Sequence, residues 1–185
     1  IPRFDPQYNP PPQDTRAVGS IFNSLGPSTN SISDRVRTDK FNRLSKAEKE
    51  ALALTLAGEI DPRPQYGGAP YGTQKNRQEI ADILQTIENR AKDRGLSREK
   101  TVKQRSQYSA WNDAKGKRVA GSNLNENFSD ITRGMHDFYS GSLTPSNERL
   151  NHYYASGGAS RINAPPWTSN LDPLAQTNQH RFFGP

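Results

Sequence analysis

The chain has 185 residues, a formal net charge of +6 and no cysteine. This length suffices for one domain with a tail, and the lack of cysteine excludes disulfide bonds and thiolate chemistry. No apolar run reaches the roughly 18 residues that a membrane-spanning helix needs. Hydrophobic residues make up only 31% of the chain, so we expect a small core beside a poorly ordered region. The positive charge favours an anionic partner, although a charged surface can also serve solubility alone.

Residues 1–42 differ in composition from the rest of the chain. IPRFDPQYNPPPQD holds five prolines in 14 positions, and GSIFNSLGPSTNSISD is rich in Ser, Asn and Gly. Neither stretch keeps a helix or strand period, which predicts an extended arm or linker that could dock on a partner protein. The first residue is Ile rather than Met and no signal peptide is visible, so the chain is interpreted as a processed or excised piece. The folded domain is expected over residues 43–185.

The first predicted helix runs from Ser45 to about Ile60. SKAE, residues 45–48, has the form of a capping box, in which the Ser side chain accepts from the backbone of Glu48 and the Glu side chain bonds back. The following segment, LALTLAGEI, is apolar on most sides, which is typical of a buried helix. An Asp-Pro pair then ends the helix.

A Pro/Gly-rich loop over 61–76 leads to a second predicted helix over 77–94, which Gly95 ends. Its apolar stripe consists of Ile80, Ile83, Leu84, Ile87 and Ala91. The opposite face, which is expected to lie in water, carries Asp82, Gln85, Glu88 and Lys92. The stripe is expected to face the core.

A third helix is predicted over 126–140, with Ile131, Met135 and Phe138 on one face. Two short segments near the C-terminus, 149–156 and 180–184, have strand character and are expected to pair. The sequence therefore predicts an α+β domain that is mostly helical, with a minor antiparallel sheet.

Glu59 is a candidate catalytic residue because it ends a helix that is otherwise apolar. Burial and the partial negative charge at a helix C-terminus both disfavour a charged carboxylate. A carboxyl group held protonated near neutral pH can act as a general acid. The alternative is a structural role, in which Glu59 pairs with a distant arginine or with Arg63.

Three short stretches gather aromatic and hydrogen-bonding side chains. They are QYSAWND at 107–113, HYY at 152–154 and PPW at 165–167. Aromatic faces stack on sugar rings, while amides and hydroxyls bind the ring substituents, so these stretches fit a carbohydrate site. The same aromatic residues could equally belong to the core.

Five segments, in this order, resemble the SleB-type cell wall hydrolases, a family of spore-cortex lytic enzymes with bacterial and phage relatives and a lysozyme-like fold. LALTLAGEI resembles the helix that ends in the catalytic glutamate, and EIADILQTIENRAKD resembles the second helix with its Asn-Arg pair. QYSAWND is similar to the Gln-Phe/Tyr-Ser-x-Trp-Asn motif. The stretch of the family from a Gly-x-x-x-Pro turn to Pro-x-Trp is similar to GSLTPSNERLNHYYASGGASRINAPPW. The terminal Gly-x-His-x-Phe-Tyr motif of the family is similar to NQHRFFG. The chain departs from the family at Asp61-Pro-Arg-Pro, at Tyr154 and at Thr177-Asn178.

The resemblance implies a lysozyme-like domain that cleaves peptidoglycan between N-acetylmuramic acid and N-acetylglucosamine, with Glu59 as general acid and base. It places the activity in the cell wall or periplasm, or in a phage particle that acts there. No second carboxylate is evident, which favours a lytic transglycosylase over a muramidase. No cofactor and no metal are implied. The residues implied for substrate binding are Tyr108, Ser109, Trp111, Asn112, His152, Tyr153, Tyr154, Trp167 and His180.

Several of these residues keep a structural alternative. Each of the two histidines could be a core residue bonded to a backbone carbonyl, and Trp167 could be core rather than cleft wall. A zinc site is disfavoured, since three histidines occur without HExxH or cysteine. Nucleic-acid binding is disfavoured because Lys and Arg are scattered. The main rival is a non-catalytic structural or glycan-binding part of a larger assembly, such as a phage particle.

Overall fold

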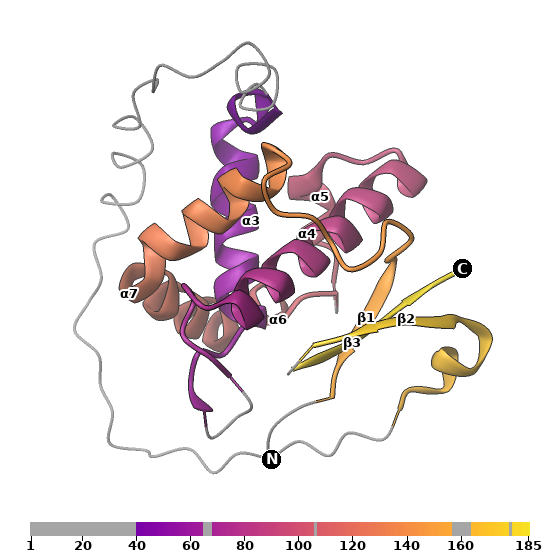
Figure 1. Ribbon diagram of the computed structural model, residues 1–185. Helices are drawn as coiled ribbons and strands as arrows, with labels where there is room; N and C mark the ends of the chain where they lie inside the picture. Colours follow the sequence, from indigo (N-terminus) through magenta and orange to yellow (C-terminus); the bar gives the residue numbers. More distant parts are fainter. Residues whose placement is uncertain (1–39, 65–67, 106, 157–163, 178) are drawn as a thin grey trace.

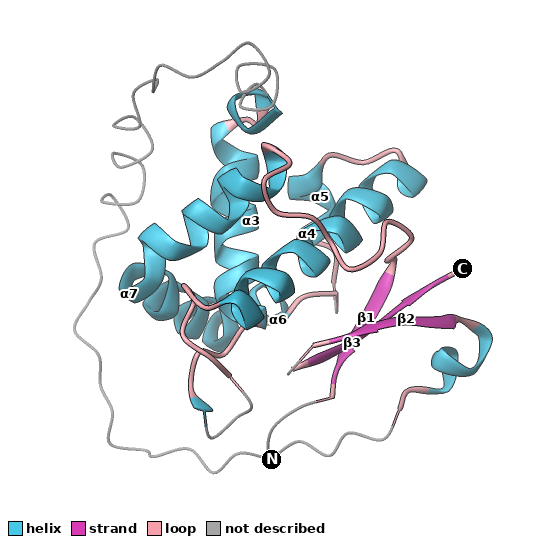
Figure 2. Ribbon diagram, viewed as in Figure 1, coloured by secondary structure: helices cyan, strands magenta, loops and turns pink. Residues whose placement is uncertain are grey.

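Helices occupy one side of the molecule and a three-stranded antiparallel sheet the other (Figure 1). The computed structural model describes residues 40–64, 68–105, 107–156, 164–177 and 179–185. The predicted arm therefore lies outside the described residues, except for its last three positions. Residues 40–43 form a helical turn and Phe41 is buried, so the core includes a residue just before the expected domain start. The predicted α+β class, mostly helical with a small antiparallel sheet, is confirmed (Figure 2).

The main helices are α3 (Lys46–Glu59), α4 (Gln74–Arg94) and α7 (Ala114–Tyr139), with the short helices α5 (Arg98–Val102) and α6 (Ser109–Asn112) between them. The strands are β1 (His152–Ala155), β2 (Asp172–Gln176) and β3 (His180–Gly184), and a 3-10 helix, η2 (Pro166–Asn170), precedes β2. No helix of the described part is long and apolar enough to cross a membrane.

Helix α3 is the central element of the core. The predicted capping box at its start is confirmed: Ser45 Oγ accepts from the backbone of Glu48 at 3.1 Å, and Glu48 Oε2 accepts from the backbone of Ser45 at 3.1 Å. Leu52 and Leu56 are fully buried, as the apolar sequence predicts. Helix α3 makes its most extensive contact with α7 and also packs against α5 and α6, so its C-terminal end lies where several segments meet.

Helix α7 starts twelve residues before the predicted third helix. The earlier part, AKGKRVAGSNLN, contains Gly, Ser and Asn and has weak periodicity, so its own propensity does not indicate a helix. It is helical because Ala120 and Leu124 pack into the core. The helix has a non-helical residue at Asn127 (φ −121°, ψ 20°), close to the predicted start. The prediction thus found the segment after the kink and missed the one before it.

The two predicted strands pair as expected, with Tyr153 opposite Phe182 and His152 opposite Phe183. Strand β2, which was not predicted, pairs with the other edge of β3, giving the order β1-β3-β2. Its sequence, DPLAQ, is short and contains Pro, and Pro is tolerated on an edge strand. Alternation along β1 places Tyr153 on one face of the sheet and its two strand neighbours, His152 and Tyr154, on the other.

The polar face of α4 lies in water only in part, since Lys92 is exposed as predicted, Gln85 and Glu88 are partly buried and Asp82 is not exposed. Asp82 is fully buried, and it accepts hydrogen bonds from the backbone and hydroxyl of Ser146 at 2.6 and 2.8 Å. Further along α4, Asn89 donates to the carbonyls of Glu148 and Leu150, and Arg90 donates to that of Asn151. These side chains hold the loop over 140–151 against α4, and this loop leads directly into β1.

We expect Asp82→Asn to become more stable relative to the wild type as pH rises. Burial raises the pKa of Asp82, although hydrogen bonds from Ser146 and Gln78 oppose this. Because this pKa is raised in the folded state, ionising the carboxyl group lowers the free energy of unfolding. This loss of stability is absent below the unfolded pKa of about 3.9 and is complete once the pH exceeds the folded pKa. Asn keeps the shape of the side chain and removes this cost.

Urea denaturation of both proteins between pH 3 and pH 8 measures the effect. The free energy of unfolding of the variant minus that of the wild type should increase through the acidic range and then level off. A difference that decreases with rising pH would show that the Ser146 contacts outweigh burial.

Candidate active site

Glu59 is the last residue of α3, and the glycine before it shapes its surroundings. A Cβ atom at Gly58 would lie 2.8 Å from the Cβ of Ala110 and 3.2 Å from that of Ala120. Because glycine has no Cβ, α6 can lie close against the last turn of α3. This approach brings Ser109, the first residue of α6, beside Glu59. The Glu59 side chain is half-buried, so it is more accessible than the apolar helix predicted.

Three hydrogen bonds orient the Glu59 carboxylate. The backbone N–H of Ser109 and the Ser109 hydroxyl both approach Oε1, each at 2.7 Å, and the Tyr153 hydroxyl donates to Oε2 at 3.0 Å. The Ser109 hydroxyl has one proton for two acceptors, because it also lies 2.8 Å from the carbonyl of Gly58. Both donor residues come from segments that are distant in the chain, so the sequence did not show that they contact Glu59.

Tyr153 keeps its proton when it contacts Glu59. Burial and then the charge of Glu59 raise the pKa of Tyr153 well above its ordinary value. Its ring is surrounded by those of His180, Phe182 and Tyr108, with centroids at 4.9, 5.3 and 6.1 Å. The phenol is therefore a neutral hydroxyl in a fixed ring, able to donate to a carboxylate or to accept from a carboxylic acid.

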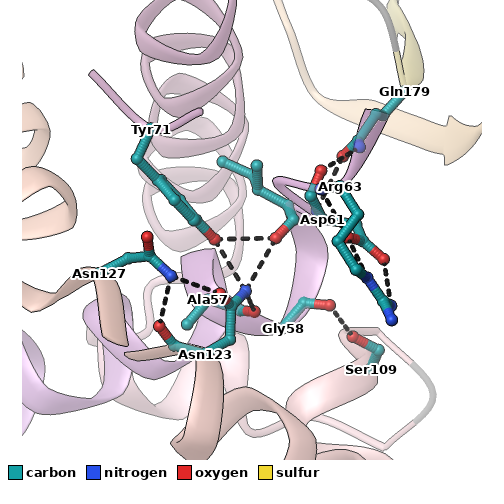
Figure 3. A network of polar contacts seen from close by, with 10 residues as sticks. Ala57, Gly58, Asp61, Arg63, Tyr71, Ser109, Asn123, Asn127 and Gln179 are labelled. Atoms are coloured by element: carbon teal, nitrogen blue, oxygen red, sulfur yellow. Dashed lines mark hydrogen bonds and ion pairs between the residues drawn. The ribbon is translucent and has the colours of Figure 1, made fainter. Parts of the chain in front are cut away.

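The backbone carbonyls at the end of α3 are satisfied by side chains from distant segments (Figure 3). The amide of Asn123 donates to the carbonyls of Ala57 and Ile60 at 2.6 and 3.1 Å, and to the hydroxyl of Tyr71 at 3.0 Å. The Tyr71 hydroxyl donates to the Ile60 carbonyl at 2.8 Å. These contacts close the helix end and hold Glu59 in place from the α7 side.

The chain directly after Glu59 is held by a second set of contacts. The backbone N–H of Asp61 donates to Gln179 at 3.0 Å, and the Gln179 amide donates back to the Asp61 carbonyl at 2.5 Å. Arg63 pairs with Asp61, with Nη2 and Oδ2 at 2.6 Å, rather than with Glu59 (Figure 3). Burial acts to raise the pKa of Asp61, but the hydrogen bonds and charge of Arg63 lower it overall. Within the described residues no ion pair involves Glu59.

The structure brings two of the sequence-predicted residues, Ser109 and Tyr153, into contact with Glu59. Tyr108 lies behind the site: it is 1% exposed, burial raises its pKa, and Arg90 donates to its hydroxyl at 3.4 Å. Trp111 packs partly buried against α3 and donates from Nε1 to Thr55 at 2.9 Å. Trp111 thus supports α3 and Tyr108 packs behind Tyr153, whereas the QYSAWND motif that contains them was expected to line a cleft.

The remaining predicted residues lie elsewhere. His152, Tyr154 and Trp167 share the face of the sheet opposite Tyr153, where Trp167 contacts both other rings at 5.5 and 6.2 Å. Burial, together with the charges of Arg90 and Arg94, lowers the pKa of His152. His180 is 2% exposed and faces Glu79 rather than a backbone carbonyl.

A surface pocket of about 370 Å³ adjoins the site on the α6–α7 side. It is lined by Gly58, Ser109, Asn112, Asp113, Lys115, Gly116 and Val119. Asn112 is exposed, and Val119 is the large hydrophobic side chain that the described part of the chain exposes most, at 50%. The pocket therefore offers an amide, a charged group and an apolar surface next to Glu59.

Sequence reasoning did not identify Tyr71, Asn123, Gln179 or Glu79 as supports of the site. Tyr71 was part of a loop and Asn123 lay in an unassigned segment. A single amide or carboxylate carries no local signal of which residue it will contact.

Among the described residues, no group of three or more His, Asp or Glu could hold a metal ion. In comparisons with known proteins, no family model, no curated protein and no solved structure matched the chain.

Proposed function

We propose that this protein is a peptidoglycan lytic transglycosylase of lysozyme-like fold, with Glu59 as its general acid and base. The observation that carries the proposal is the half-exposed Glu59 carboxylate, which is oriented by Ser109 and Tyr153. These two residues come from the QYSAWND and HYY stretches, which sequence similarity to SleB-type enzymes had marked. Among the described residues Glu59 makes no ion pair, which is the contact expected of a purely structural glutamate.

The two carboxylate oxygens of Glu59 have different roles. A backbone N–H can only donate, so Oε1 must remain an acceptor towards Ser109. Oε2 faces the Tyr153 hydroxyl, which can donate or accept. The protonated form of Glu59 therefore carries its proton on Oε2, and Tyr153 orients that oxygen.

The reaction uses Glu59 twice, first as an acid and then as a base. Glu59 first donates its proton to the glycosidic oxygen as the bond from that oxygen to C1 of N-acetylmuramic acid breaks. The resulting carboxylate is stabilised by Ser109 and Tyr153. It then removes a proton from the C6 hydroxyl of the same sugar, whose oxygen attacks C1 and closes a 1,6-anhydro ring. Glu59 ends protonated, and no water is consumed.

A hydrolytic muramidase is less well supported, because it normally uses a second carboxylate. Asp61 and Asp113, the two acidic residues considered as a second carboxylate, already have structural partners. Asp61 binds Arg63 through two side-chain contacts of 2.8 and 2.6 Å, and Asp113 caps α7 by accepting from the backbone of Gly116 at 2.6 Å. The transglycosylase reaction needs neither of them.

The pocket beside Glu59 is proposed to receive a sugar of the glycan strand. Its volume lies near the lower end of the roughly 300–1,000 Å³ of small-molecule sites. Asn112 can hydrogen-bond the acetamido group, while Val119 can contact its methyl group. His152, Tyr154 and Trp167 are left out of this substrate site because they share the other face of the sheet.

Digestion of purified peptidoglycan by the full chain, with products read by mass spectrometry, tests the proposal. We expect muropeptides that end in 1,6-anhydro-N-acetylmuramic acid. Products with reducing ends would replace the transglycosylase with a muramidase. Absence of any product would favour the non-catalytic alternative, a structural or glycan-binding component of a larger assembly.

A further inference from the structure

A buried acid–histidine pair lies behind the candidate site. Nδ1 of His180 on β3 is 2.6 Å from Oε1 of Glu79 on α4, and their side chains are 3% and 4% exposed. The hydroxyl of Thr177 donates to the same Glu79 oxygen at 2.7 Å. One proton lies between the Glu79 oxygen and Nδ1 of His180 in this contact, and Nδ1 points at Glu79 whichever of the two atoms carries it. The direction of the imidazole ring is therefore set by Glu79.

The imidazole ring in turn packs against Tyr153. The two rings meet edge to face, with centroids 4.9 Å apart and an interplanar angle of 80°. Such contacts depend on the relative orientation of the two rings. Tyr153 contacts Glu59 through a single hydrogen bond of 3.0 Å. The position of its hydroxyl therefore depends on the residues that fix the orientation of its ring.

Tyr108, another ring against Tyr153, is also tied to α4. Arg90 lies three helical turns after Glu79, on the same side of α4, and donates to the Tyr108 hydroxyl. Two polar side chains of one helix thus hold two rings that contact Tyr153. A well-packed apolar pair would usually be as stable as a buried ionisable pair, so the Glu79–His180 contact calls for a role other than stability.

We propose that Glu79 and His180 are positioning residues that hold Tyr153 against the Glu59 carboxylate. The kinetic consequence rests on the proposed function, whereas the orientation of Tyr153 does not. Neither Glu79 nor His180 is accessible to a substrate. Loosening them should therefore lower kcat, through a misplaced Oε2, and leave KM unchanged.

A double-mutant cycle between Glu79→Gln and Tyr153→Phe measures this coupling. Glutamine retains an oxygen that can accept from His180 and Thr177 but loses the charge. Alone, it should lower kcat by about 10-fold, because small misplacements of reacting groups are costly. In the Tyr153→Phe background it should lower kcat no further. Asp82→Asn, which alters another buried carboxylate of α4, is the matched control and should leave kcat unchanged.

An NMR measurement tests whether Glu79 orients the ring of Tyr153, and it does not require the protein to be an active enzyme. With ring-labelled tyrosine, the Tyr153 signal is assigned by its loss in Tyr153→Phe. It should shift or broaden in Glu79→Gln and stay in place in Asp82→Asn. Thr177→Val, which removes one of the two contacts to Glu79, serves as a milder variant if Glu79→Gln does not fold.

The outcomes separate the two proposals. An inactive wild type whose Tyr153 signal responds to Glu79→Gln would refute the transglycosylase and retain the positioning role. An active wild type with additive effects in the cycle, or an unmoved Tyr153 signal, would overturn the positioning role alone.

Discussion

Replacing Glu59 by Gln is expected to lower the rate of peptidoglycan cleavage by about 10²–10⁴-fold, the usual contribution of a general acid or base. The amide cannot deliver a proton to the glycosidic oxygen or remove one from the C6 hydroxyl. The fold should be retained, because Gln can accept from the Ser109 backbone through its oxygen and donate to the Tyr153 hydroxyl through its nitrogen. Muropeptide release read by mass spectrometry gives the rate, and thermal unfolding checks the fold.

Glu50→Gln is the matched control for this experiment. Glu50 lies on the same helix, more than two turns earlier, and pairs with Lys46 at 3.9 Å on the surface. Its replacement should leave cleavage at the wild-type rate. Equal activity of Glu59→Gln and wild type would remove Glu59 from the mechanism, and the site would then need another acid.

Asn123→Ala is expected to give the largest loss of stability among the variants considered, about 2–4 kcal/mol in the free energy of unfolding. The change deletes the three contacts that the Asn123 amide nitrogen donates and the one that its oxygen accepts from Asn127, and it leaves the carbonyl of Ala57 without this donor at the end of a buried helix. A buried polar group without a partner costs about 1–3 kcal/mol, in addition to the bonds themselves. Because the same contacts hold the end of α3, cleavage should also decrease.

Asn127→Ala provides the comparison for this variant. Asn127 donates to the backbone and side chain of Asn123 but not to α3, at 3.0 and 2.9 Å. Its loss should cost about 1–2 kcal/mol, the net contribution of two ordinary hydrogen bonds. Urea unfolding measures both variants. Similar losses for the two would show that the carbonyls of α3 find other donors, such as water.

The elements that the sequence predicted well are those specified by short-range chemistry. The capping box at Ser45 and Glu48 involves residues three positions apart. The stripe of α4 and its end at Gly95, which has φ 61°, also depend on local spacing and on the freedom of glycine. The placement of Glu59 at the end of α3 follows from the same local pattern. The pairing of β1 with β3 was predicted because each strand is rich in aromatic residues.

The features that the sequence did not predict depend on contacts between distant segments. Half of α7 is helical through its packing on α3, although its own propensity is low. Asp82 looked like a surface residue, since the loop that buries it lies more than 60 positions away in the chain.

By itself, the sequence determined α3 with its capping box, the stripe and end of α4, and the position of one unusual glutamate. Only the tertiary structure decided what surrounds that glutamate. Ser109 lies 50 residues from Glu59 and Tyr153 lies 94 residues away. Local periodicity reports which side of an element is buried, but not which distant side chain meets it. The donors of the Glu59 carboxylate, and the buried pair behind Tyr153, are therefore properties of the packing of α3, α4, α6 and the sheet.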